Sequence, residues 1–118
     1  MRTQPKRPAS SPMDVKRDSS NIFYIPVTIS ATGQPSIPSG ESTLRVNSDR
    51  TLVWTCDQDF NVWFTDRLVP AVSDSKHKNG AKFAKELAAS KIPYRNLEYE
   101  YSIDTDGGRL DPKVIVNK

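Results

Sequence analysis

Alternating apolar and polar residues near the C-terminus predict a closing β-hairpin. Between residues 97 and 103 every second residue is apolar or aromatic, which is the period of a strand with one buried face. Asp106-Gly107-Gly108 follows, and these residue types tolerate the positive φ of a tight reversal. A short apolar run over residues 110–116 ends the pattern. Such a hairpin favours an antiparallel β domain.

Four more strands are predicted ahead of this hairpin, over residues 21–29, 42–47, 51–56 and 60–64. Pro26 has no amide donor, so it predicts an edge strand or a bulge within the first of them. Residues 30–41 are rich in Pro, Gly and Ser and predict a loop. The alternation places the following side chains in the core: Ile25, Val27, Leu44, Val46, Leu52, Trp54, Val62, Phe64, Tyr99, Tyr101 and Val114.

Residues 80–90 break the period of two and predict a short helix that Pro93 would end. The apolar residues that recur there at helical spacing are Phe83, Ala84, Leu87 and Ala88. About six strands with one short helical insertion predict an all-β, mainly antiparallel fold. The strand count favours a β-sandwich with Greek-key connections.

Four short motifs stand in order along residues 21–118: Thr51-Leu52-Val53-Trp54-Thr55 followed by Asp57, Phe60-Asn61-Val62-Trp63-Phe64, Tyr99-x-Tyr101-x-Ile103, and Leu110-Asp111-Pro112-x-Val114-Ile115-Val116. Their order resembles that of bacterial cupredoxin-like domains. The resemblance implies a cupredoxin-like or Ig-like two-sheet sandwich, with the helix packed at one edge or end. In copper-binding members, a Cys and the second His normally lie in the loop before the final strand.

The chain departs from those members at the metal ligands. A blue-copper site needs two His and a Cys, usually with a distal Met. The chain has one histidine, His77, and its single cysteine, Cys56, lies on the third predicted strand. Met1 and Met13 both precede the predicted domain. We therefore expect a domain without the copper ligands, and we assign it no metal and no cofactor.

Charge is concentrated at the N-terminus of this 118-residue chain. Residues 1–20 carry five basic and two acidic side chains, which accounts for the whole net charge of +3. Because this stretch has few large apolar residues, it predicts a disordered basic tail, followed by one β-sandwich domain over residues 21–118. Pro5-Lys6-Arg7-Pro8 has the spacing of a docking motif, but the pattern is short and common, and a solubilising tail is the favoured interpretation.

Cellular location is constrained by two further features of the sequence. No apolar run approaches the roughly 20 residues that span a bilayer, so no transmembrane segment is expected. The basic N-terminus has no apolar stretch behind it, so it does not resemble a secretory signal. With a single cysteine, which suits a reducing compartment, these features predict a cytoplasmic protein.

Two surface features are candidate binding residues. Trp63 points away from the core if its neighbours point inward, so it is either an exposed anchor for a partner or a structural residue covered by the helical insertion. Lys78, Lys82 and Lys85 fall on the polar face of the predicted helix. They predict either an anion-binding stripe or a solvated helix face.

Three groups of residues bear on catalysis, and a structural interpretation is favoured for each. Cys56 needs a nearby base to act as a nucleophile, and His77 is the only histidine. Asp57 and Asp59 can pair as acid and base, but turn aspartates that accept backbone amides explain their spacing. The third group, Asp104, Asp106 and Asp111 with Gly107, resembles a calcium loop but lacks its bidentate Glu.

A non-catalytic interaction module is the function that these features favour. A protein partner is the first choice, and self-association through an uncovered edge strand is compatible with it. The alternative is nonspecific nucleic-acid association through the basic tail and the lysine stripe. An enzyme that uses the Asp57/Asp59 turn is the least favoured class.

Overall fold

The computed structural model describes residues 21–38 and 43–117 and shows an all-β fold. The strands are β1 (Ile22–Pro26), β2 (Thr28–Ile29), β3 (Pro35–Ser36), β4 (Thr43–Asn47), β5 (Thr51–Cys56), β6 (Asn61–Phe64), β7 (Ser73–Asp74), β8 (Phe83–Ala88), β9 (Glu98–Thr105), β10 (Gly108–Leu110) and β11 (Lys113–Asn117). A single 3-10 turn, η1 (Ala89–Lys91), follows β8. The predicted tail over residues 1–20, with its Pro5–Pro8 motif, lies outside the described residues.

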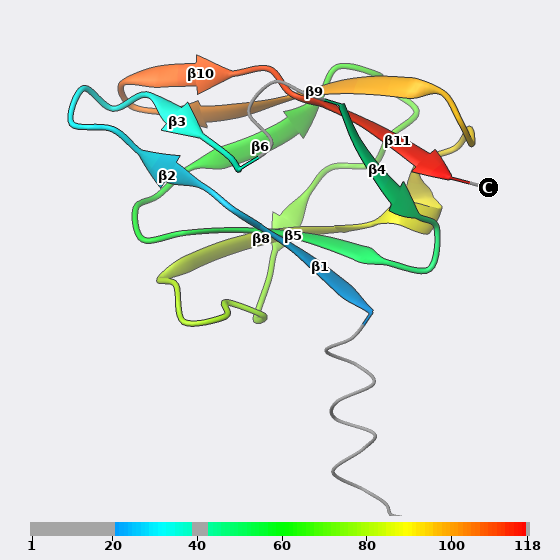
Figure 1. Cartoon of the computed structure of the whole chain (residues 1–118), viewed down its shortest axis with the longest axis horizontal. Helices are drawn as coiled ribbons and strands as arrows, with labels where there is room; N and C mark the ends of the chain where they lie inside the picture. The colour runs from blue at the N-terminus through cyan, green and yellow to red at the C-terminus, as the bar shows by residue number, and fades with distance from the viewer. Residues whose placement is uncertain (1–20, 39–42, 118) are drawn as a thin grey trace, which may run out of the picture.

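Two main sheets lie face to face with the core between them (Figure 1). The first sheet has the order β1-β5-β8-β7. In the second sheet β9 is central. One of its edges pairs with β6, and the other pairs with β10 and then β11 along its length. β4 lies beyond β11. The pairs β1–β5 and β4–β11 are parallel, whereas the other pairings of the described strands are antiparallel. The prediction of a mainly antiparallel all-β fold is confirmed.

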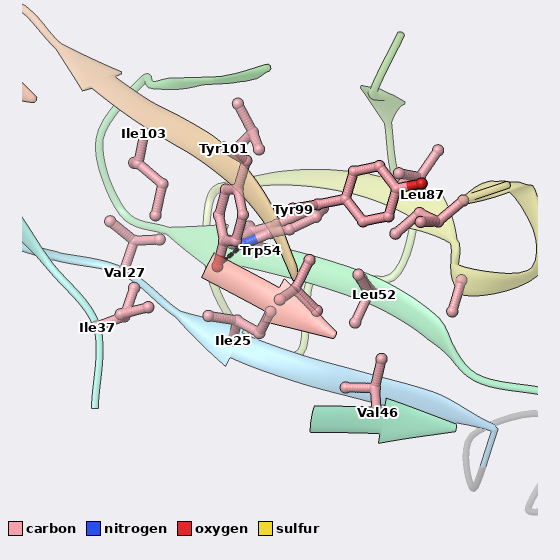
Figure 2. Packing of buried hydrophobic residues seen from close by; sticks show 14 of the residues in the cluster. Ile25, Val27, Ile37, Val46, Leu52, Trp54, Leu87, Tyr99, Tyr101 and Ile103 are labelled. Atoms are coloured by element: carbon pink, nitrogen blue, oxygen red, sulfur yellow. Dashed lines mark hydrogen bonds between the residues drawn. The ribbon is translucent and has the colours of Figure 1, made fainter. Parts of the chain in front are cut away.

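The core contains the inward residues that the alternation predicts. Nine of the eleven are buried, and Leu44 and Phe64 are partly buried against the same cluster. At its centre the Trp54 indole N–H of β5 donates to the Tyr101 hydroxyl oxygen of β9 at 3.3 Å, which joins the two sheets (Figure 2). Their ring centroids lie 5.3 Å apart in an edge-to-face arrangement, a favourable geometry for aromatic pairs.

The predicted helix over residues 80–90 is wrong. Residues 83–88 form β8, which lies between β5 and β7 and pairs with β5 from Thr51↔Ala88 to Cys56↔Phe83. Only η1 is helical in this segment. Ala, Lys, Glu and Leu are strong helix formers, but pairing on both sides and burial of Ala84 and Leu87 outweigh this local preference.

The predicted closing hairpin is confirmed, with one interruption. β10 and β11 pair with β9 in a single continuous register, from Gly108↔Thr105 to Ile115↔Glu98. Between them, Pro112 accepts a hydrogen bond from the Tyr101 amide at 3.0 Å but has no N–H to return. The missing donor divides what is otherwise one long strand.

Gly107 serves close packing rather than a left-handed backbone. Positive φ among the described glycines occurs at Gly33 and Gly80. A Cβ on Gly107 would lie 2.6 Å from the Thr32 carbonyl oxygen and 2.7 Å from Gly33 Cα. The glycine therefore lets the β9–β10 turn contact the loop between β2 and β3. The Thr105 hydroxyl, which donates to the Gly33 carbonyl, strengthens this contact.

Pro26 is located at an edge, as predicted. β1 is an outer strand of the first sheet, and within residues 21–38 and 43–117 its one partner is β5. The chain is interrupted after Pro26 and resumes as β2, so the predicted strand over residues 21–29 is two short strands.

Candidate functional site

A basic loop over residues 75–82 joins β7 to β8 and runs below β8 in Figure 1. It carries Lys76, His77, Lys78 and Lys82. Asn79 and Gly80 both have positive φ, 50° and 88°, which Asn and Gly adopt more readily than other residues. The Ala81 amide donates to the Lys78 carbonyl at 2.8 Å and closes the turn. The basic side chains are thus displayed on a hydrogen-bonded turn.

One hollow of about 400 Å³ lies beside this loop, and we call it the basic hollow. Its lining includes all three lysines of the predicted stripe. The full set is Asp59, Asp74, Ser75, Lys78, Lys82, Phe83, Ala84 and Lys85. The stripe is therefore a real spatial group, although the loop and β8 form it rather than one helix face.

Lys85 is held by an ion pair at the sheet edge. Its ammonium lies 2.6 Å from Asp74 Oδ1, and its side chain is only 19% exposed. The hydrogen bond and charge of Lys85, followed by the charge of Lys78, lower the pKa of the Asp74 carboxyl. Because Asp74 is 87% exposed, water screens this pair strongly. The pair nevertheless occupies the Lys85 ammonium within the structure.

Lys78 and Lys82 carry the unpaired positive charge of the basic hollow. In the described part of the chain neither of them has an ion-pair partner. Phe83, which is 39% exposed, lines the same hollow. Asp59 adds a carboxylate whose Oδ1 already accepts the Phe60 amide at 2.9 Å. The hollow thus offers two ammonium groups next to an aromatic ring, a combination that suits an anionic ligand with an apolar part.

Trp63 faces outward as predicted and is 40% exposed. Its indole N–H donates to Asp104 Oδ2 at 2.7 Å, and the Arg109 guanidinium lies 5.3 Å from its ring centroid. Arg109 Nε also donates to Asp104 Oδ1 at 2.8 Å. Burial raises the pKa of Asp104, but the hydrogen bonds from Trp63 and Arg109 outweigh it and lower the pKa. Trp63 is therefore partly covered by Arg109, not by the helix that the sequence predicts.

The residues considered for nucleophilic catalysis do not form a site. Cys56 is buried at 5% exposure, and its sulfur accepts the Gln58 amide at 3.5 Å. His77 lines a different hollow of about 300 Å³ with Lys76 and Glu86. No hydrogen bond joins Cys56 to His77 among residues 21–38 and 43–117.

The candidate carboxylates come together only in part: Asp59, Asp104 and Asp106 line one small hollow of about 140 Å³. Asp59 lines the basic hollow, whereas Asp57 is exposed and lies outside its lining. Asp104 is bound to Trp63 and Arg109, and Asp111 accepts the Ser102 hydroxyl at 2.6 Å. Within the described ranges, no group of three or more His, Cys, Asp and Glu side chains is arranged to hold a metal ion.

Sequence reasoning misses Phe83 and Asp74 as members of the site. The helical period places Phe83 on the apolar face of a helix, and Asp74 lies outside the predicted helix. An extended segment over residues 83–88 would place Phe83 and Lys85 on one face, since they are two residues apart. That spacing is visible in the sequence, but the helical period obscures it.

Comparisons with protein-family models, with curated proteins and with solved structures find no match to this chain. In the portion of the chain that is described, no helix has the length and apolar character needed to cross a membrane.

Proposed function

We propose that this chain is a non-catalytic β-sandwich interaction module that binds a protein partner, and that the basic hollow receives an acidic segment of that partner. The observation that carries the proposal is the convergence of Lys78 and Lys82, both without an ion-pair partner in the described residues, beside the half-exposed Phe83. Opposite charges steer an acidic segment toward the hollow, and the ring supplies apolar contact that charges alone lack.

The lack of a base beside the buried thiol supports a binding role rather than nucleophilic catalysis. Cys56 is buried without a histidine partner, and Asp59 lines the hollow without Asp57. Trp63 stays a second candidate contact, on the outer face of the other sheet. Its indole N–H is already used by Asp104, so only its exposed ring is free for a partner.

The cupredoxin-like resemblance belongs to the same proposal. Its motifs lie on β5, β6, β9 and the β10–β11 strand, which together contribute to both facing sheets. The segment between β9 and β10, ahead of the final strand, contains neither Cys nor His. We therefore propose a Greek-key, cupredoxin-like scaffold used for binding and not for copper electron transfer. A reducing compartment such as the cytoplasm suits its free thiol.

Charge reversal in the hollow tests the binding role. The double variant Lys78→Glu/Lys82→Glu should bind a labelled dodecapeptide of alternating Glu and Val at least about tenfold more weakly than the wild type, because attraction becomes repulsion. Fluorescence anisotropy at about 0.15 M salt measures this, where charges beyond about 8 Å are largely screened.

The matched control is Lys76→Glu/Lys91→Glu, which makes the same change in net charge outside the lining of the basic hollow. Its affinity for the peptide should stay within about threefold of the wild type. Equal losses in both double variants would show that net charge alone governs binding. An absence of any peptide binding by the wild type would refute the proposal.

Nucleic-acid association is the second candidate, because the same hollow places Phe83 beside two lysines. Single-stranded nucleic acids bind through base stacking on aromatic rings and through phosphate contacts. Phe83→Leu keeps an apolar side chain and removes the stacking surface. A large loss of oligothymidylate affinity in Phe83→Leu, with a steep dependence on salt, would favour this candidate over the acidic peptide.

A further inference from the structure

The geometry points to a binding mode for the proposed partner: we infer that its acidic segment adds to the free edge of β7 as a β-strand. This inference rests on the proposed function and specifies the conformation of the partner. It follows from the position of β7, from the direction of its backbone groups and from the place of the basic hollow beside it.

Among the described strands, β7 is the outermost one of the first sheet and pairs only with β8. Both of its residues, Ser73 and Asp74, are exposed. Edge strands present a row of unpaired N–H and C=O groups, and such groups are templates for an added strand. The segment before β7 includes Pro70, which has no amide donor and so limits the length of the template.

The register of the β7–β8 pair sets which groups are free. The Ser75 amide donates to the Ala84 carbonyl at 2.9 Å, and Ser73 lies opposite Glu86 in the same register. In an antiparallel ladder, bonded and non-bonded pairs alternate along the strand. Ser73 and Ser75 therefore direct their backbone groups to β8, and Asp74 directs its N–H and C=O away from β8, toward the open edge.

The open edge and the basic hollow are adjacent. Asp74 and Ser75 line the hollow together with Lys78 and Lys82. Side chains on an added strand alternate between its two faces, so every second residue on one face can meet the lysines. A peptide that alternates acidic and apolar residues satisfies the backbone edge and the two ammonium groups at once.

An extended peptide fits this arrangement better than a nucleic acid does. A peptide supplies the N–H donor and the C=O acceptor that the free groups of Asp74 require. A nucleic-acid backbone offers acceptors to the Asp74 amide but has no regularly spaced N–H for its carbonyl. The occupant of this edge is therefore an acidic peptide segment in the extended conformation.

Asp74→Pro is the decisive variant, with Asp74→Ala as its matched control. Both remove the ion pair with Lys85, but only proline removes the outward N–H. Proline is tolerated where the amide faces away from the ladder, on an edge strand, and its neighbour Ser73 is already extended. We expect Asp74→Pro to bind the alternating Glu-Val dodecapeptide about five- to tenfold more weakly than Asp74→Ala does.

A second measurement needs no protein variant, so it decides the matter if Asp74→Pro fails to fold. Two versions of the dodecapeptide carry N-methyl groups either on all Glu amides or on all Val amides. Because only alternate amides of an added strand face β7, one version should lose at least about tenfold in affinity and the other should lose clearly less.

The outcomes separate the binding mode from the proposed function. Strand addition is overturned if Asp74→Pro and Asp74→Ala bind the peptide equally well and both methylated peptides bind equally well. If that binding still needs Lys78 and Lys82, the proposed function stands. Failure of the wild type to bind the unmodified peptide at low salt overturns both. Binding of oligothymidylate in place of the peptide overturns both in favour of a nucleic-acid ligand.

Discussion

Single residues in this fold are constrained by backbone approach and by burial of polar groups. Gly107 illustrates the first constraint, since the β2–β3 loop leaves no room for a side chain there. Tyr101 illustrates the second, since its hydroxyl is buried in the core and has Trp54 as its hydrogen-bond partner. Each constraint leads to a measurable effect of one substitution.

Gly107→Ala should destabilise the domain by about 2 to 3 kcal/mol, because its Cβ would collide with backbone atoms that cannot rotate away. Gly80→Ala is the matched comparison, since Gly80 has φ of 88° but nothing within 4 Å of an added Cβ. It should cost only about 1 kcal/mol, from the left-handed backbone. Urea unfolding measures both values, and equal losses would contradict a packing role for Gly107.

Stability should fall between about pH 10 and pH 12 because of Tyr101. Burial raises the pKa of this phenol to about 12, against a small opposing effect of the Trp54 hydrogen bond. Above its ordinary pKa of about 10, the unfolded chain loses the proton while the folded chain keeps it, so unfolding is favoured as the pH rises. The difference between the folded and unfolded pKa of Tyr101 corresponds to at most about 3 kcal/mol of stability.

Tyr101→Phe isolates this effect, because it removes the titrating hydroxyl and keeps most of the ring packing. The free energy of unfolding, measured by urea denaturation from about pH 9 to about pH 11.5, should fall less steeply in the variant than in the wild type. Parallel pH profiles for the two proteins would show that Tyr101 does not titrate differently on unfolding.

At the scale of elements, β8 is the instructive case. Its residues are mostly good helix formers, and the spacing of Phe83, Ala84 and Leu87 fits a helix better than a strand. The strand exists because β5 and β7 pair with it on both sides. Local preference and tertiary context disagree here, and context prevails.

An isolated peptide of residues 78–91 should therefore become helical in trifluoroethanol, a solvent that enriches helix beyond native content. Far-ultraviolet circular dichroism should show helical minima for the peptide, while the intact domain keeps a β-type spectrum. A peptide that stays unstructured at every alcohol concentration would mean that the segment has no real helical preference. In that case the pairing of β8 with its neighbours would not oppose any local helical preference.

The strands that the sequence predicts well share one property, a clear period of two. The strand of residues 51–56 has its predicted bounds, and the prediction for residues 60–64 is one residue too long at its start. The prediction for residues 42–47 matches β4 over its described residues, 43–47. The lysines of the basic hollow are recognisable as a group through their charge. Their predicted arrangement is wrong because it depends on the helix, so the contribution of Phe83 is missed.

At the scale of the whole molecule, the sequence indicates faces but not partners. A period of two shows which side chains point inward, yet it gives neither the neighbour of a strand nor its direction. The turn at Asp106-Gly107 predicts that β9 and β10 are neighbours, because the connection is too short for any other arrangement. Nothing comparable marks the parallel pairs β1–β5 and β4–β11, whose members are joined through long stretches of chain.

The parallel pair β4–β11 has a consequence for how the chain folds as it is synthesised. Thr43 pairs with Lys113, seventy positions later, and the fully buried Val114 and Val116 lie on the late strand. Until residues 113–117 have been synthesised, the edge of β4 that pairs with β11 is unpaired, and the core lacks the side chains of Val114 and Val116. Contacts so distant in sequence slow folding, and the exposed edge invites aggregation in the interval. The nascent chain is therefore prone to aggregation until residues 113–117 have left the ribosome and paired with β4.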